Sequence, residues 1–412
     1  MSTWKKTPFE SLLVDSKDGE WGEGDSAVGL REALIIRGTD FPDLNNPGAE
    51  FPRRWVKEHI VERKQLQARD LILETAGGTS TQSTGRSVLL TKSFFDHHRD
   101  IPVLCASFSR HLRLDMEKYS PHFIYYLLQA LYRTGYMAVF NIQHTGVSRF
   151  QYTAFKNHTE LRLPDRPLQE KIAAILSAYD ELIENNRRRI ALLEKLAEEI
   201  YREWFVRLRF PGHEKVKKVK GVPVGWLVQE LKDVADEVGK STRPGAHLAE
   251  RFYLPLDLLN TKQMLPAGHA DYTEAQSSLV TFEKNDFLFG AMRPYQHKVA
   301  IAPFPGITRT TCFVIRPKIA NAWSWLFLTL FQPTTVDYAS LICNGADRPY
   351  AVWNKAMERM KLLRPDDKLL EKFEAIARPI LDAIVSMYFV QQKLTACRDK
   401  LLPRLISGKI AV

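Results

Sequence analysis

The sequence has few cysteines, and they lie far apart. Its 412 residues include four, none in a Cys-x-x-Cys pair and none near a His at metal-ligand spacing (Cys105, Cys312, Cys343 and Cys397). The sequence therefore predicts neither a disulfide framework nor a zinc site. It also has no signal-peptide-like apolar start and no apolar run of membrane-spanning length. We expect a cytoplasmic protein with no membrane partner.

Signatures of catalysis are also scarce. The stretch "GEGDSA" at Gly22–Ala27 follows no buried strand, so it does not predict a phosphate-binding turn. No Pro-Pro dipeptide is present, which excludes the Asp/Asn-Pro-Pro-aromatic loop of DNA amino-methyltransferases. One pattern stays open as an alternative: Asp43, Glu62 and Lys64 have the residue types of a magnesium-dependent nuclease.

Acidic residues are outnumbered by basic ones. The chain has 58 Lys and Arg against 48 Asp and Glu, a formal net charge of +10, which favours a polyanionic partner. With 45% hydrophobic residues, a chain of this length is predicted to form two or three domains with substantial cores.

Glycine and proline are absent between Pro167 and Pro211. Apolar residues recur every three or four positions through this stretch, as in the seam of a coiled coil. The pattern predicts one helix of roughly 58 Å at ~1.5 Å per residue.

The same helical pattern occurs a second time near the C-terminus. An ungapped offset of 201 residues aligns Pro164 with Pro365 and brings the two apolar seams into register, with Pro379 predicted to kink the second helix. A region of mixed α/β pattern precedes each helix, with an Asp before an apolar run (Asp70, Asp286). The chain is therefore predicted to be a duplication.

The order globule, helix, globule, helix favours antiparallel packing of the two helices, because this needs less connecting chain than parallel packing. If the seams are centred on each other, facing residue numbers sum to 577. Asn186 and Gln391 interrupt the two seams and satisfy this sum. We hypothesise that their side chains hydrogen-bond to each other and fix the register. The alternative is that both residues lie at the solvated edge of the helix pair.

Basic and hydroxyl-rich loops, several of them adjacent to glycine, are the candidates for nucleic-acid contact. Arginine suits bidentate contact with guanine, and Ser, Thr and Gln reach several bases. In the first half the candidates are Thr81, Gln82, Thr84 and Arg86, then Ser148 and Arg149 of "GVSR". In the second half they are Arg293, Tyr295, His297, Lys298, Arg309 and, in "GADR", Arg348.

Both helices, from "LPDRPLQEKIAAILSAYDELIENN" and "LTACRDKLLPRLISGKI", resemble the spacer helices of the specificity subunits of type I restriction–modification systems. The segment "NDFLFGAMRPYQHKVAIAPFPGITRTTCFVIRP" resembles that family's target-recognition domain, and "RDLILETAGGTSTQSTGRSVLL" does so more faintly. The resemblance covers nearly the whole chain and is weakest over residues 1–60.

The resemblance implies an α+β fold with two target-recognition domains. Each is followed by a long helix, and the helices form an antiparallel coiled-coil spacer with pseudo-two-fold symmetry. The expected division is 1–164 and 226–364 for the recognition domains, 165–209 and 365–412 for the helices, and 210–225 for a linker.

The function implied is recognition of a bipartite site in double-stranded DNA without catalysis or a metal site in this chain. Two methyltransferase subunits and restriction/translocase subunits are the implied protein partners, and S-adenosylmethionine, ATP and Mg²⁺ are expected on those partners. A self-contained nuclease or DNA-modification enzyme, and a basic coiled-coil scaffold that binds no DNA, are the alternatives.

Overall fold

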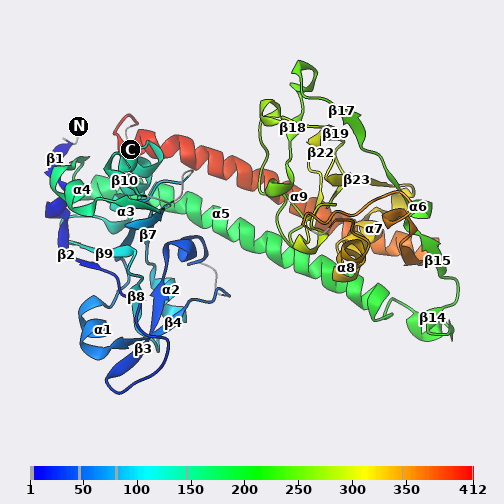
Figure 1. The fold of residues 1–412 in the computed structure, drawn as a ribbon, viewed down its shortest axis with the longest axis horizontal. Helices are drawn as coiled ribbons and strands as arrows, with labels where there is room; N and C mark the ends of the chain where they lie inside the picture. Colours follow the sequence, from blue (N-terminus) through cyan, green and yellow to red (C-terminus); the bar gives the residue numbers. More distant parts are fainter. Residues whose placement is uncertain (1–3, 45–47, 79–81, 145–146, 346, 411) are drawn as a thin grey trace. The chain divides into compact units, whose positions relative to one another are not determined.

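The chain folds into two compact units. A computed structural model describes residues 1–412 except 1–3, 45–47, 79–81, 145–146, 346 and 411. Unit 1 comprises Met1–Leu182 and Thr395–Val412, and unit 2 comprises Ile183–Leu394. The borders fall within two long helices, α5 (Arg166–Tyr201) and α9 (Asp367–Ile406), which therefore contribute to both units (Figure 1). The predicted division treats these helices as separate segments, whereas their ends pack into the two cores.

Unit 1 is built on a four-stranded antiparallel sheet of order β2-β9-β5-β7. Its central strand, β5, is buried along its whole length, and successive side chains enter different cores. Leu71 and Leu73 pack with helix α3, while Ile72 faces a second sheet of order β4-β3-β8. These strands are β2 (Leu13–Asp18), β3 (Leu30–Ile36), β4 (Arg53–Lys57), β5 (Leu71–Glu74), β7 (Ser87–Leu89), β8 (Val103–Cys105) and β9 (Ser109–Leu114).

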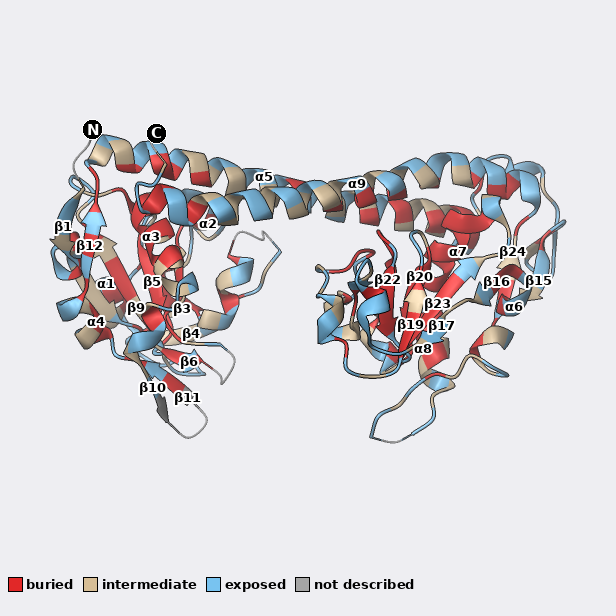
Figure 2. Ribbon diagram, turned by 90° about the horizontal axis from the view of Figure 1, so that it is seen from above, coloured by how far each residue is buried: buried red, intermediate tan, exposed pale blue. Residues whose placement is uncertain are grey.

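Unit 2 repeats this arrangement. Its four-stranded sheet has the order β16-β23-β20-β21, and a second sheet has the order β17-β19-β22-β18. Its central strand β20 is also buried throughout, and both central strands lie within the buried interior in Figure 2. The strands are β16 (Ala235–Glu237), β17 (Lys240–Thr242), β18 (Phe252–Tyr253), β19 (Leu279–Phe282), β20 (Phe287–Gly290), β21 (Val299–Ile301), β22 (Gly306–Arg309) and β23 (Cys312–Pro317).

A two-stranded ribbon leads into each long helix. In unit 1 β1 (Lys5–Pro8) pairs with β12 (Glu160–Leu163), and in unit 2 β15 (Leu227–Glu230) pairs with β24 (Lys361–Arg364), both antiparallel. Strands β12 and β24 begin 201 residues apart, at Glu160 and Lys361. Equivalent strands in equivalent order confirm the predicted duplication and the α+β class.

Shorter elements complete the two units. In unit 1 Ser120 caps α3 by accepting from the Phe123 N–H, and Pro121 takes the first helical position, where no N–H is needed. In unit 2 every residue of α7 is buried, as expected of a helix that is apolar all round. The remaining helices and strands are α1 (Glu58–Lys64), β6 (Ala76–Gly78), α2 (Lys92–His97), α3 (Pro121–Arg133), β10 (Asn141–His144), β11 (Val147–Phe150), α4 (Tyr152–His158), β13 (Lys218–Val219), β14 (Val222–Pro223), α6 (Leu231–Val234), α7 (Trp323–Leu330) and α8 (Pro333–Leu341).

Within each unit, α5 and α9 run antiparallel. In unit 1 Arg398 Nη1 donates to Asp180 Oδ1 over 2.7 Å. In unit 2 the rings of Tyr201 and Phe373 lie 6.3 Å apart between centroids, and Asn186 reaches Met387. Within unit 2, as the α5 number rises from 186 to 201 the facing α9 number falls from 387 to 373, close to the predicted register.

The predicted hydrogen bond between the side chains of Asn186 and Gln391 is wrong, because Asn186 has a different partner. Asn186 is buried, but its Nδ2 donates to the backbone carbonyl of Met387, one turn before Gln391, over 2.8 Å. The Oε1 of Gln391 is buried and accepts no hydrogen bond within the described part of the chain. The short side chain of Asn186 reaches the backbone carbonyl of Met387. That Asn186 and Gln391 set the register remains a prediction.

The end of the first predicted helix also differs from expectation. Helix α5 ends at Tyr201 and a single π-helical turn follows, η4 (Arg202–Val206), where a helix to residue 209 was predicted. Helix α9 continues through Pro379 as one helix to Ile406, and Pro379 lies exposed on it. The linker contains the short β13–β14 hairpin.

Candidate nucleic-acid interface

Three chain segments meet beyond the end of the central strand in unit 1. After β5, the N–H groups of Thr75 and Ala76 both donate to the Phe108 carbonyl, over 2.8 and 3.1 Å. The Phe150 N–H donates to the Thr75 carbonyl over 2.9 Å, so β11 lies against β6, with Arg149 opposite Ala76. Thr84 and Ser148, both predicted from sequence, lie together here, with Thr84 Oγ1 3.0 Å from Ser148 Oγ.

The same junction recurs in unit 2. After β20, the N–H groups of Ala291 and Met292 donate to the Thr311 carbonyl over 2.9 and 3.2 Å. The Ala351 N–H donates to the Ala291 carbonyl over 2.8 Å. All three predicted loops of this half therefore meet: the one after β20, the one after β22 and the one before β24. We call the two places the strand-end junctions.

The junctions correct one equivalence that the sequence suggests. Phe150 and Ala351 make the same backbone hydrogen bond, so Arg149 corresponds to Tyr350 and not to Arg348, the Arg of the second Gly-x-x-Arg. Tyr350 is half exposed and was missed because it lies outside that pattern. Phe108 is an exposed aromatic residue of the first junction that was also missed; its only sequence signal is an aromatic residue between two serines.

Four of the predicted arginines are exposed at the junctions. They are Arg149 in unit 1 and Arg293, Arg309 and Arg348 in unit 2. Among the residues that the structure describes, none of them forms a salt bridge or a side-chain hydrogen bond, so their guanidinium groups face solvent. Tyr295, 60% exposed, lies beside Arg293 in the same turn. These five side chains can reach an external anion or a base edge.

Other predicted contacts are buried within the fold. Thr84 and Ser148 are 0% and 2% exposed, and Thr84 Oγ1 donates to Ser148 Oγ over 3.0 Å, joining the loop to β11. Their hydroxyls therefore do not face a ligand, and the prediction that they contact DNA is wrong for this conformation. Gln82 is exposed, and Thr81 lies outside the described residues.

Arg86 and Lys298 are also engaged inside the protein. Arg86 donates from Nε to Oε2 of the buried Glu74 over 2.9 Å and from Nη2 to the Gly38 carbonyl over 3.1 Å. The hydrogen bond to Glu74, the larger cause, raises the pKa of Arg86. Lys298 Nζ donates to the Leu256 carbonyl over 2.8 Å. Both side chains hold loops in place, which corrects their assignment as DNA contacts.

His297 is a third correction. Its ring is buried, with Nε2 2.9 Å from the Phe331 carbonyl and the ring edge-on to Phe331. Burial lowers the pKa of His297, so the neutral imidazole with a proton on Nε2 donates to that carbonyl. The residue anchors the turn that presents Arg293 and Tyr295.

A buried aspartate braces the central strand in both units. Asp70 precedes β5 and accepts two hydrogen bonds from Arg113 of β9, from Nε over 2.9 Å and from Nη2 over 2.7 Å. Asp286 precedes β20 and accepts two from Arg316 of β23, over 2.6 and 2.9 Å. Each also accepts a backbone N–H three residues earlier. These are the two aspartates that the sequence repeat pointed to.

Lys64 of the alternative nuclease centre is not available to a substrate. Lys64 is buried, and its ammonium donates to the Gly19 carbonyl over 3.1 Å and lies 3.3–3.4 Å from carboxylates of Asp18 and Glu20. Its positive charge is therefore paired with carboxylates within the fold, and its ammonium group cannot polarise a bound phosphate. In the described part of the chain no cluster of three or more His, Cys, Asp or Glu residues is arranged to hold a metal ion.

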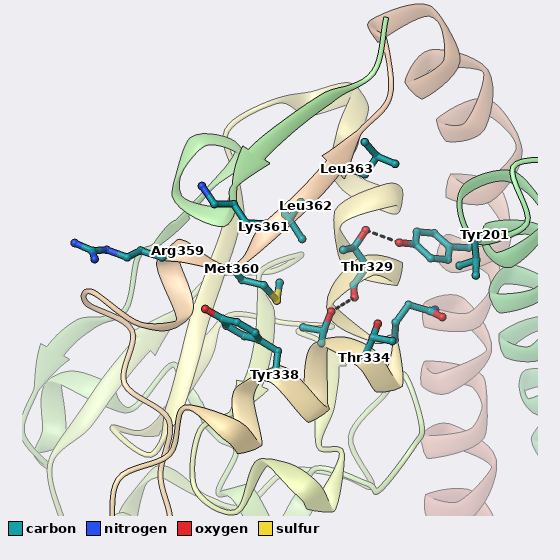
Figure 3. A pocket seen from close by; sticks show the side chains of 12 residues that line it. Tyr201, Thr329, Thr334, Tyr338, Arg359, Met360, Lys361, Leu362 and Leu363 are labelled. Atoms are coloured by element: carbon teal, nitrogen blue, oxygen red, sulfur yellow. Dashed lines mark hydrogen bonds between the residues drawn. The ribbon is translucent and has the colours of Figure 1, made fainter. Parts of the chain in front are cut away.

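A hollow of about 410 Å³ lies in unit 2 between α8, β24 and the end of α5 (Figure 3). Some of its lining groups bond to one another. Tyr201 Oη and Thr329 Oγ1 are 2.9 Å apart, and Thr335 Oγ1 donates to the Thr329 carbonyl over 2.7 Å. Among the described helices, none is long and apolar enough to cross a membrane.

Two copies of one α+β unit, each with an exposed arginine at its strand-end junction, define the class as a duplicated α+β protein. Residues 66–195, from just before β5 into α5, match the sequence model of the family described as type I restriction modification DNA specificity domain. The expected resemblance to the specificity subunits of type I restriction–modification systems is confirmed over this part of the chain.

Similar proteins agree with this assignment. The MjaIX specificity subunit of Methanocaldococcus jannaschii is 24% identical over 267 residues, which cover 61% of this chain and 61% of that protein. The HindI specificity subunit of Haemophilus influenzae is 21% identical, covering 70% of this chain and 77% of that protein. In fold, the chain resembles the crystal structure of a type I S subunit from M. genitalium, with a TM-score of 0.59, 16% identity, and coverage of 98% of this chain and 96% of that one.

Proposed function

We propose that this chain is the sequence-specific DNA-recognition subunit of a type I restriction–modification enzyme and that each unit reads one half of a bipartite site. One observation carries the proposal: the same strand-end junction, with at least one exposed arginine, occurs once in each copy of the duplicated fold. Arginine contacts both phosphates and guanine edges, and the net charge of +10 favours a polyanion.

The two junctions have the same backbone but different side chains. Gly77 and Gly78 follow Ala76 in unit 1, whereas Arg293 and Pro294 follow Met292 in unit 2. Side chains that contact base edges carry the sequence information. Two junctions with the same backbone but different side chains therefore favour two different half-sites.

The long helices would set the distance between the half-sites. Helix α5 has 36 residues, which corresponds to about 54 Å at ~1.5 Å per residue. Two readers on one face of B-DNA stand about 34 Å apart, or a multiple of this distance. A helix of this length is sufficient for one such separation.

The catalytic steps belong to other subunits in this proposal. Two methyltransferase subunits and restriction/translocase subunits would bind this chain in the cytoplasm and carry S-adenosylmethionine, ATP and Mg²⁺. The chain itself would contribute recognition without catalysis. The engagement of Lys64 with Asp18 and Glu20 gives no support to a self-contained nuclease.

Methylation mapping tests this function directly. Genomic DNA from cells that express the full chain together with type I methyltransferase subunits of the same host should carry modified bases at one bipartite motif of two different half-sites and a fixed gap. Cells expressing the methyltransferase subunits alone are the control and should lack that motif. Methylation at the same motif without this chain would overturn the proposal, as would DNA cleavage by the chain alone with Mg²⁺.

The scaffold alternative is tested by salt. A recognition subunit keeps its preference for the mapped motif over an unrelated duplex as salt is raised, because base contacts do not depend on counterion release. A basic scaffold would release both duplexes over the same range of salt concentration.

A further inference from the structure

The turn after β20 in unit 2 has an unusual backbone. Arg293 (φ 50°, ψ 59°) and His297 (φ 51°, ψ 56°) are both in the left-handed region, and between them η9 (Pro294–Gln296) makes a single 3₁₀ turn. Non-glycine residues rarely adopt this conformation, and it persists only where the surroundings enforce it. Two such residues within five mark this turn as a place where the fold holds a costly conformation.

Contacts on the inner side of the turn account for its persistence. His297 donates to the Phe331 carbonyl, and the Lys262 N–H donates to the His297 carbonyl over 2.9 Å. Pro294 is buried and fixes its own φ. The Arg293 N–H donates to the Pro349 carbonyl over 2.8 Å, which ties the turn to the segment before β24.

The outer side of the turn carries the exposed side chains. Arg293 and Tyr295 point away from these anchors into solvent, and no acidic residue of the described chain pairs with Arg293. Arg309 ends strand β22 and Arg348 lies on the loop before β24, and neither has a left-handed backbone. Arg293 is therefore the exposed arginine of this junction that the fold holds in a costly backbone conformation.

We propose that the Arg293–His297 turn is the base-reading element of unit 2, in which Arg293 reads a guanine in the major groove and His297 is a buried positioning residue. A guanidinium whose Cα is fixed loses less entropy when it makes the bidentate contact to O6 and N7. Arg309, at the end of β22, and Arg348, on the loop before β24, contact phosphates. This assignment rests on the proposed function.

Selection from a library of random-sequence DNA duplexes at moderate salt, using the full chain, tests the assignment. The wild-type protein is expected to select two half-sites, one containing a guanine that Arg293→Ala no longer prefers. The preference for that guanine should fall roughly 5- to 150-fold, while the other half-site is unchanged. Arg309→Ala is the matched control and should weaken binding to all selected sequences by a similar factor without changing the preferred bases.

His297→Asn tests the positioning role, because Asn tolerates the left-handed backbone but is too short to reach the Phe331 carbonyl. It should reduce the preference for the same guanine, with Arg293 present and the other half-site intact; a merely structural residue would lower affinity for every sequence alike. If this variant does not fold, Arg293→Ala alone decides, because Arg293 is exposed.

The outcomes separate the two proposals. If the wild-type chain selects no sequence, the proposed function fails and the assignment fails with it. If it selects two half-sites and Arg293→Ala selects the same ones, or neither half-site contains a guanine, only the assignment of Arg293 is overturned. A uniform loss of affinity with Arg293→Ala would likewise make Arg293 a phosphate contact and overturn the assignment.

Discussion

At the scale of single residues, the two Asp–Arg pairs differ in what surrounds the carboxylate. Asp286 is 2% exposed as a side chain and its partner Arg316 is 47% exposed. Asp70 is equally buried, but His111 Nε2 lies 3.2 Å from it in addition to Arg113. Burial alone would raise the pKa of Asp70, but contacts with Arg113 and His111 outweigh burial and lower it. Among the residues that the structure describes, Asp286 forms a salt bridge with Arg316 only.

This asymmetry predicts unequal costs for breaking the pair in unit 2. Arg316→Met leaves a buried carboxylate without its cation and should destabilise unit 2 by about 3 kcal/mol. Asp286→Asn returns a half-exposed arginine to water and keeps an acceptor for the Glu283 N–H, so about 1–2 kcal/mol is expected. Hydrogen exchange of the β20 amides, read by mass spectrometry, reports on this unit separately.

Arg113→Met in unit 1 is the matched comparison. His111 Nε2 still lies 3.2 Å from Asp70 in this variant, so the loss measured at the β5 amides should be smaller than that caused by Arg316→Met at β20. Equal losses in the two units would show that His111 gives Asp70 no support.

At the scale of elements, α5 is fastened to unit 2 by a buried carboxylate. Glu194 is 9% exposed, and its Oε1 accepts the Met264 N–H over 2.8 Å. Burial, the largest cause, raises the pKa of Glu194 from 4.5 to about 7. The folded state therefore binds a proton at this site that the unfolded state has released between these two pH values. Stability must fall as the pH rises through this window and level off above it.

Glu194→Gln should remove this pH dependence. Glutamine keeps a carbonyl acceptor for the Met264 N–H and has no charge to desolvate, so the variant should gain on the order of 3 kcal/mol at pH 8 relative to the wild type and little at pH 4. Urea unfolding of the full chain at both pH values measures the difference. Glu199→Gln, at a partly exposed position on the same helix, is the control and should show no such gain. A gain that is the same at both pH values would contradict the raised pKa.

The elements were more predictable than the contacts between them. The helical seams and the offset of 201 follow from apolar spacing, which a long buried stripe enforces over many residues. The Asn186 partner was missed because sequence spacing gives the facing position but not whether a side chain or a backbone carbonyl lies nearer. The burial of Thr84, Ser148 and His297 was missed because polar residues in a loop read alike whether they face solvent or tie the loop down.

At the scale of the whole molecule, the proposed role makes helix length the quantity that determines the gap between half-sites. Residues near the unit border face each other in the antiparallel register, as Asp180 and Arg398 do in unit 1 and Asn186 and Met387 do in unit 2. Four residues inserted after Leu182 and four after Leu394 would therefore enter at opposing positions and keep both seams paired on either side.

Such a double insertion should change the gap and leave both half-sites as they were. Four residues add about 6 Å to each helix and slightly more than one full turn, and 6 Å corresponds to nearly two base pairs at about 3.4 Å each. Methylation mapping should then show the same two half-sites separated by a longer gap. Four residues inserted after Lys220, in the exposed β13–β14 turn, lengthen the chain equally without lengthening a helix and should leave the gap unchanged. If the recognised bases changed while the gap stayed constant, the paired helices would not be the spacer, and the distance between half-sites would have to be set by the recognition units themselves.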